Sequence, residues 1–124
     1  MTRCVIALGL LALVTGCGSG SSRPESEIER GRAAVAAALD AWKANEPPSK
    51  LKSLPDPVEF SDELRKTHAL TDYTLGKVED SGKDVVHYEA TLSLKDKKGK
   101  QTTLKVVFAV VLKSPVVVSR DPYY

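Results

Sequence analysis

Residues 84–95 read Asp-Val-Val-His-Tyr-Glu-Ala-Thr-Leu-Ser-Leu-Lys, and residues 101–113 read Gln-Thr-Thr-Leu-Lys-Val-Val-Phe-Ala-Val-Val-Leu-Lys. In the first stretch every even-numbered residue from Val86 to Leu94 is apolar or aromatic, and in the second the same holds from Leu104 to Leu112. Side chains alternate between the two faces of a β-strand, so this period of two predicts two strands that each bury one face.

The short segment between these strands predicts how they pair. Gly99 ends the loop Lys97–Gly99, where a three-residue hairpin loop needs a residue in the left-handed conformation. Such a loop pairs Asp96 with Lys100 and therefore sets Leu92 opposite Leu104 and Tyr88 opposite Phe108. A shift of one residue would turn one apolar face into water, which makes this register the favoured one.

Weaker strand patterns flank the hairpin. Residues 72–79 predict a strand whose inward phase slips at Gly76, which indicates a β-bulge. Residues 116–120 predict a short last strand, with Pro115 at its start, where a missing N–H donor is tolerated. The sheet is therefore expected to be an antiparallel meander of three or four strands.

A helix is predicted from Glu25 to about Asn45. Its expected inner face recurs at spacings of three and four residues: Ile28, Gly31, Val35, Ala38, Leu39 and Trp42. Pro47 and Pro48 end the helix, because proline cannot continue the hydrogen-bond ladder.

The following residues, 46–60, are rich in proline and predict a connecting loop held to the core by apolar side chains, namely Leu51, Leu54, Val58 and Phe60. Residues 61–66 then predict one or two helical turns with Ser61 as the N-cap.

The expected fold class is α+β, with one long N-terminal helix packed on a three- to four-stranded antiparallel meander. In the order of its elements, the stretch from residue 25 to about 120 resembles the cystatin-like and NTF2-like group of folds and small uncharacterised bacterial lipoproteins that carry such a domain. Residues 25–124 are expected to form this single domain.

The N-terminus resembles a bacterial lipoprotein signal peptide. Arg3 precedes an uncharged stretch, residues 5–15, which is too short to cross a membrane. Val14-Thr15-Gly16-Cys17 matches the lipobox. The resemblance implies cleavage between Gly16 and Cys17, removal of residues 1–16, and acyl chains on Cys17 that anchor the protein to a membrane.

Residues 17–24 are then the lipidated cysteine and a flexible tether of Gly, Ser and Pro. By the same resemblance, an Asp after the lipidated cysteine retains a lipoprotein in the inner membrane. This chain has Gly18 there. The expected location is therefore the cell envelope, facing the periplasm or the exterior, with the outer membrane favoured over the inner.

Composition restricts the function classes. A formal net charge of +2 does not favour nucleic-acid binding. The two cysteines are Cys4, which leaves with the signal, and Cys17, so no disulfide is expected. His68 and His87 are the only histidines and lack the spacing of a metal site, so no metal and no cofactor are expected. His87 is expected to be solvated, on the sheet face away from the helix.

Acid–base catalysis is one hypothesis for the carboxylates Glu59, Asp62, Glu63 and Asp72. They lie in a polar segment with nothing to bury them, so a solvated surface is the favoured interpretation. We assign no catalytic residue and expect no enzyme; an NTF2-like enzyme remains the minor alternative.

Two other groups of residues have both a structural and a functional interpretation. The aromatic residues Trp42, Tyr73, Tyr88 and Phe108 either fill the core or line a cavity between helix and sheet, and a cavity would make the protein a small-molecule or lipid binder. Lys95, Lys97, Lys98 and Lys100 crowd the hairpin tip. They either contact anionic lipid headgroups or simply keep the turn soluble.

The least ordinary pattern is on the opposite face of the second hairpin strand. Val107, Ala109 and Val111 are apolar there, with Val85 beside them and Val117 nearby. One interpretation is an ordinary central strand whose β-branched residues simply have high strand propensity. The other is that a strand with two apolar faces is covered on both. A second copy of the chain, another envelope protein, or the C-terminal residues 121–124 are candidates. A non-catalytic interaction or structural module is therefore the expected function.

Overall fold

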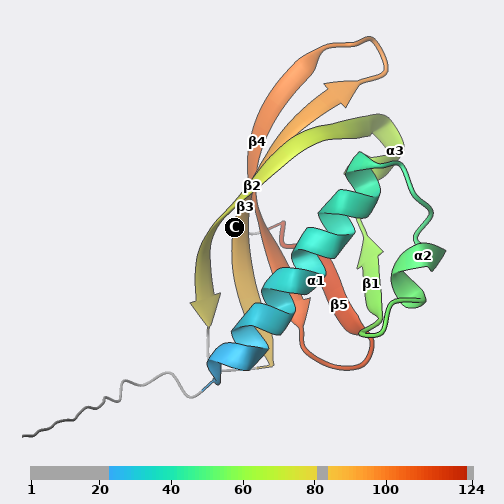
Figure 1. Ribbon diagram of the computed structural model, residues 1–124. Helices are drawn as coiled ribbons and strands as arrows, with labels where there is room; N and C mark the ends of the chain where they lie inside the picture. The colour runs from blue at the N-terminus through green and yellow to red at the C-terminus, as the bar shows by residue number, and fades with distance from the viewer. Residues whose placement is uncertain (1–22, 81–83, 123–124) are drawn as a thin grey trace, which may run out of the picture.

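A computed structural model describes residues 23–80 and 84–122. The signal peptide, Gly16, Cys17 and Gly18 lie outside these residues, so the lipobox remains a prediction from sequence. The described part is α+β: one five-stranded mixed sheet with a helix packed on it (Figure 1).

The helices and strands follow each other as α1 (Glu25–Lys43), α2 (Ser49–Lys52), β1 (Val58–Ser61), α3 (Leu64–Thr67), β2 (His68–Asp80), β3 (Val85–Asp96), β4 (Gln101–Val111) and β5 (Val116–Arg120). The strand order in the sheet is β1-β5-β4-β3-β2. Helix α1 crosses one face of the sheet diagonally, and the β3–β4 hairpin extends beyond the helix's C-terminal end (Figure 1).

The C-terminal end of α1 is closed by a backbone motif rather than by proline alone. Asn45 adopts the left-handed conformation, with φ of 56°. The N–H of Asn45 donates to Trp42 O at 2.9 Å, and the N–H of Glu46 donates to Ala41 O at 2.8 Å. This is the Schellman arrangement, which gives the last carbonyls of the helix their partners and turns the chain toward α2.

The hairpin register predicted from the sequence is confirmed. Leu92 pairs with Leu104 and Tyr88 with Phe108, and Gly99 has φ of 88° in the loop. The bulge is also present, as a register shift between Leu75 and Val78.

The sheet differs from the predicted meander at both edges. The segment expected to be a loop contains β1, which pairs with β5 in parallel and makes the sheet mixed. The N–H of Val116 donates to Pro57 O at 2.9 Å, so the pairing begins at the proline before β1. Strand β2 begins at His68, ahead of the expected residue 72, and a second register shift between Leu70 and Asp72 accommodates the extra length.

Residues around β1 correct two further expectations. Leu51, Val58 and Phe60 are buried as predicted, whereas Leu54 is 37% exposed. Ser61 is the last residue of β1, not a helix cap. Instead Asp62 Oδ1 accepts the N–H of Leu64 at 3.0 Å at the start of α3.

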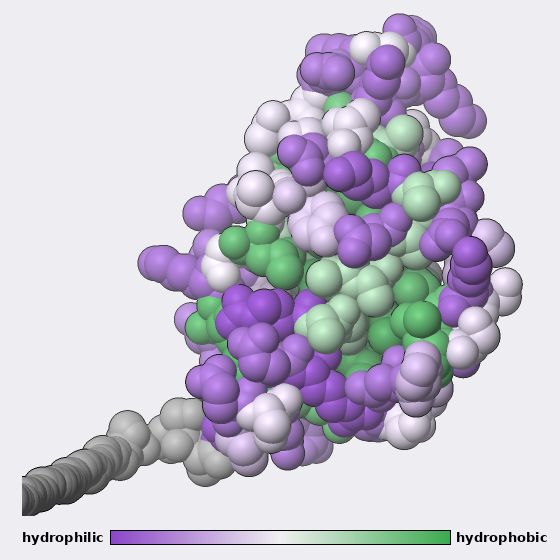
Figure 2. All heavy atoms as spheres, in the orientation of Figure 1, coloured by the Kyte–Doolittle hydropathy of each residue, from purple (hydrophilic) through white to green (hydrophobic). Residues whose placement is uncertain are grey.

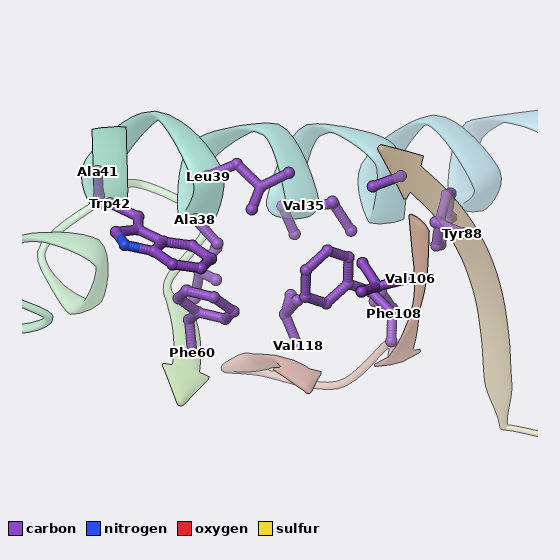
Figure 3. Packing of buried hydrophobic residues seen from close by; sticks show 14 of the residues in the cluster. Val35, Ala38, Leu39, Ala41, Trp42, Phe60, Tyr88, Val106, Phe108 and Val118 are labelled. Carbon is purple, nitrogen blue, oxygen red and sulfur yellow. The ribbon is translucent and has the colours of Figure 1, made fainter. Parts of the chain in front are cut away.

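The core lies between α1 and the sheet. Figure 3 shows Val35, Leu39 and Trp42 facing side chains of β1, β4 and β5. The ring centroids of Trp42 and Phe60 are 6.4 Å apart, and those of Phe60 and Phe108 are 6.1 Å apart. The central aromatic Phe108 is 0% exposed. Burying a side chain of this size contributes about 2–3 kcal/mol, so these contacts hold the helix on the sheet.

Candidate interaction surface

Five apolar side chains gather on the sheet face opposite α1. We call this set the outer face; it consists of Val85, Val107, Ala109, Val111 and Val117. Their register brings them together across three strands, because Val111 pairs with both Val85 and Val117. The residues between them in sequence, such as Val86, Phe108 and Val110, are buried against α1. The alternation predicted from sequence therefore places a contiguous apolar set on each face.

All five outer-face residues are partly buried. Neighbouring side chains on the same face cover some of their surface, but α1 does not, because it packs on the other face. The geometry suits contact with a second surface that is itself apolar over the Val85–Val111–Val117 row.

Beside the outer face, polar side chains cover the same side of the sheet toward the middle of the hairpin. His87 Nε2 lies 3.3 Å from Asp121 Oδ2, and Glu89 Oε1 lies 3.7 Å from Lys105 Nζ. The His87–Asp121 contact crosses β4 above Ala109, the residue that pairs with His87, and the small alanine leaves room for it. A shallow hollow of about 110 Å³ beside His87 is lined in part by Lys77, Glu79 and Val107.

The expectation of a solvated His87 was wrong. Its side chain is 13% exposed and that of Asp121 is 20% exposed. His87 does lie on the face away from the helix, as predicted, but Asp121, the residue directly after β5, covers it there. The N–H of Asp121 donates to Val107 O at 2.8 Å, which brings the carboxylate over the neighbouring strands.

The four aromatic residues considered for a cavity lie mostly in the packed core. Tyr88 and Phe108 are 1% and 0% exposed, and Trp42 is also buried. Trp42 Nε1 donates to His68 O at 3.1 Å, and the Tyr88 hydroxyl donates to Ile28 O at 2.8 Å. Tyr73 is partly buried at the core's edge and donates to Asp40 Oδ1 at 2.8 Å. These contacts favour packing as their role.

Burial shifts the ionisation of two of these side chains. Desolvation raises the pKa of Tyr88 to about 12. Desolvation, together with the hydrogen bond to Asp40, raises the pKa of Tyr73 to about 12. Both hydroxyls are therefore neutral donors at physiological pH.

One of the four carboxylates expected to be solvated is buried. The side chain of Asp62 is 1% exposed, and its Oδ2 lies 3.1 Å from Nε of Arg120 at the end of β5. Glu59, Glu63 and Asp72 are exposed, as expected. Asp62 is thus bound to Arg120 and to the start of α3, which accounts for its burial without a catalytic role.

The described residues show no cluster of three or more side chains suited to holding a metal ion. His68 Nδ1 lies 2.8 Å from the Thr67 hydroxyl at the start of β2. Over residues 23–80 and 84–122, no helix is both long and apolar enough to span a membrane.

The lysine-rich hairpin tip lies at the end of the molecule opposite the start of α1 (Figure 1). Hydrophilic residues gather there in the space-filling view (Figure 2).

Sequence analysis missed two residues that matter for the polar surfaces. Asp121 was noted only as part of the chain end. Arg65 was predicted only as part of the helical turns over residues 61–66, and no local pattern marks it, because the residues around it come from other parts of the chain.

Comparisons with protein-family models, curated proteins and solved structures found no match to this chain.

Proposed function

We propose that this protein is a bacterial envelope lipoprotein, anchored through acyl chains on Cys17, whose α+β domain is a non-catalytic interaction module. The partner is a protein surface that contacts the outer face. The resemblance to cystatin-like and NTF2-like domains belongs to the same proposal and is supported by one helix lying across a twisted sheet (Figure 1).

One observation carries the interaction role. Apolar residues Val85, Val111 and Val117 form a row across three strands on the face that α1 leaves uncovered. A sheet exposed on one side ordinarily alternates apolar and polar residues, so an apolar second face favours contact with another surface. The neighbouring polar pairs, Glu89 with Lys105 and Asp121 with His87, supply polar contacts at the rim of such an interface.

The anchor is tested by metabolic labelling with an alkyne-bearing fatty acid. The expected result is labelling of the full-length chain, and its loss in Cys17→Ala together with release from the membrane fraction. Cys4→Ala is the matched control and should leave labelling unchanged. Labelling that persists in Cys17→Ala contradicts the anchor.

The interaction role is tested by photo-crosslinking in living cells. A crosslinking amino acid at Val111, on the outer face, is expected to give one discrete adduct. The mass of the adduct tells a second copy of the chain from another envelope protein. The control position is Lys52, an exposed residue of α2 remote from the outer face. Equal adducts at both positions, or none at Val111, contradict the proposal.

A further inference from the structure

A hollow of about 370 Å³ lies at the end of the molecule where α1 stops. It is assembled from three stretches that are separate in sequence: the end of α1, the continuous segment from α3 into the start of β2, and the end of β3 with its hairpin loop. Its charged lining residues are Lys43, Arg65, Lys66, Lys95, Asp96 and Lys97, and His68 and Trp42 complete the wall at the sheet side. The fold thus brings five cations and one carboxylate together around one hollow.

The one carboxylate that lines the hollow is already used. Asp96 Oδ1 accepts the N–H groups of Lys98 and Lys100, each at 2.9 Å, and so holds the hairpin turn. Asp96 thus organises the backbone of the loop, and among the described residues it forms no salt bridge with Lys95 or Lys97.

Nearby carboxylates satisfy only part of the positive charge. Lys43 Nζ lies 3.7 Å from Asp72 and Lys66 Nζ lies 3.2 Å from Glu63. Among the described residues, no carboxylate lies within ion-pair distance of Arg65, Lys95 or Lys97. Positive charge gathered in a hollow without a counter-charge raises the local concentration of anions.

Arg65 is the residue that the fold holds in place. Its backbone N–H donates to Asp62 O at 3.1 Å, and Nη2 donates to Glu46 O at 2.6 Å. Nη1 is shielded from solvent and has no hydrogen-bond acceptor in the part of the chain that the structure describes. The guanidinium also lines the adjoining hollow next to Asn45 and Pro47. Its hydrogen-bonding capacity is therefore only partly used by the protein.

We propose that this hollow binds a phosphate-bearing ligand, with Arg65 as a positive charge held in place and Lys95 and Lys97 as flanking charges. The hydrogen bond to Glu46 O fixes the Arg65 guanidinium at the hollow, and the lysines add charge without demanding a fixed geometry. A phosphate group carries the two or more charged oxygens that three cations without counter-charge can contact at once. The site lies on the side of the molecule remote from the outer face and does not depend on the proposed function.

The test uses the chain's own fluorescence. Trp42 is the only tryptophan and lines the hollow, so its emission reports on the site. The full chain, in a non-ionic detergent, is titrated with inorganic pyrophosphate and, separately, with glycerophosphoglycerol, the headgroup of an anionic lipid. A saturable change is expected with half-saturation below about 1 mM. Preference for the headgroup identifies a lipid source, and preference for pyrophosphate identifies a soluble phosphate.

Variants show whether the signal comes from the proposed residues. Arg65→Gln is expected to weaken binding about tenfold or more, since it removes the cation that the fold holds in place at the hollow. The double variant Lys95→Gln with Lys97→Gln changes only exposed side chains and should weaken binding about threefold or more, even if Arg65→Gln folds poorly. Lys105→Gln, an exposed residue of β4 that does not line the hollow, is the matched control and should bind like the parent.

Three results would overturn the proposal. One is no saturable change with either phosphate compound. A second is an equal change with chloride at matched ionic strength or with citrate, which would mean general anion screening instead of phosphate binding. The third is binding that is unchanged both in the lysine double variant and in an Arg65→Gln variant shown to be folded.

Discussion

Where strands β3, β4 and β5 meet at Val85, Val111 and Val117, both faces of the sheet are apolar, yet their surroundings differ. On β4, Phe108 and Val110 are completely buried beneath α1, whereas their neighbours Val107, Ala109 and Val111 are partly exposed on the other face. The comparison shows that an alternating pattern predicts which residues share a face. It does not predict what covers that face, because the covering residues belong to another part of the chain or to another molecule.

The largest expected difference between the faces is in stability. Phe108→Ala removes the aromatic side chain that contacts Phe60 in the centre of the core, and it should lower the free energy of unfolding by about 3–5 kcal/mol. Val107→Ala, one residue away on the outer face, should cost about 1 kcal/mol or less. Chemical denaturation followed by Trp42 fluorescence measures both. Equal losses would mean that the outer face is part of a second core.

A rise in pH acts on the inner face through Tyr88. The pKa of Tyr88 is raised to about 12 from an ordinary 10, so the folded state favours the neutral hydroxyl. The contribution of Tyr88 to the free energy of unfolding is therefore complete below pH 10 and is lost as the pH rises from 10 to 12. The loss is on the order of 2–3 kcal/mol, since one unit corresponds to about 1.4 kcal/mol.

The measurement is stability against pH in the parent and in Tyr88→Phe. The variant should be less stable near neutral pH, because Ile28 O loses its donor, and should show a flatter decline between pH 10 and 12. An unchanged slope in the variant would mean that the alkaline loss arises elsewhere, with Tyr73 the next residue to replace.

The approach of α1 to the sheet gives a third, smaller prediction. At Gly31 an added Cβ would overlap the Tyr88 hydroxyl and lie 2.8 Å from Cζ of that ring. Gly31→Ala should therefore destabilise the fold by about 1–3 kcal/mol in spite of alanine's better helix propensity. Combining it with Tyr88→Phe should recover part of the loss, because the overlapping hydroxyl is gone. Strictly additive losses would contradict the close approach.

The hairpin illustrates what local sequence can predict. Gly99 and the strict alternation on both sides of it specify the register, and every pairing in that prediction involves residues close in sequence. Strand β1 was missed because Pro55 and Pro57 precede it and because the strand with which it pairs, β5, is distant in sequence and parallel. Parallel pairing between remote segments leaves no turn signal.

The same reason explains the missed polar residues. Asp62 is buried by Arg120, which is 58 residues away in sequence. Arg65 faces lysines that other elements bring to the hollow. The outer face was predicted correctly as a set of residues because it is a consequence of the hairpin register. The charged hollow depends on how α3 meets the hairpin tip, and that arrangement is tertiary.

The smallest expected effect on stability tests the outer face most directly. Val111→Thr keeps the shape and β-branching of valine, and strands accommodate both residues well, so the free energy of unfolding should change by about 0.5 kcal/mol or less. The same substitution at Val110, which is completely buried, should cost more, because it places a hydroxyl in the core. If the outer face binds a partner, Val111→Thr should reduce the photo-crosslinked adduct formed from Ala109 although the domain remains folded. An unchanged adduct would show that the valine row packs within the chain and contributes only to the sheet.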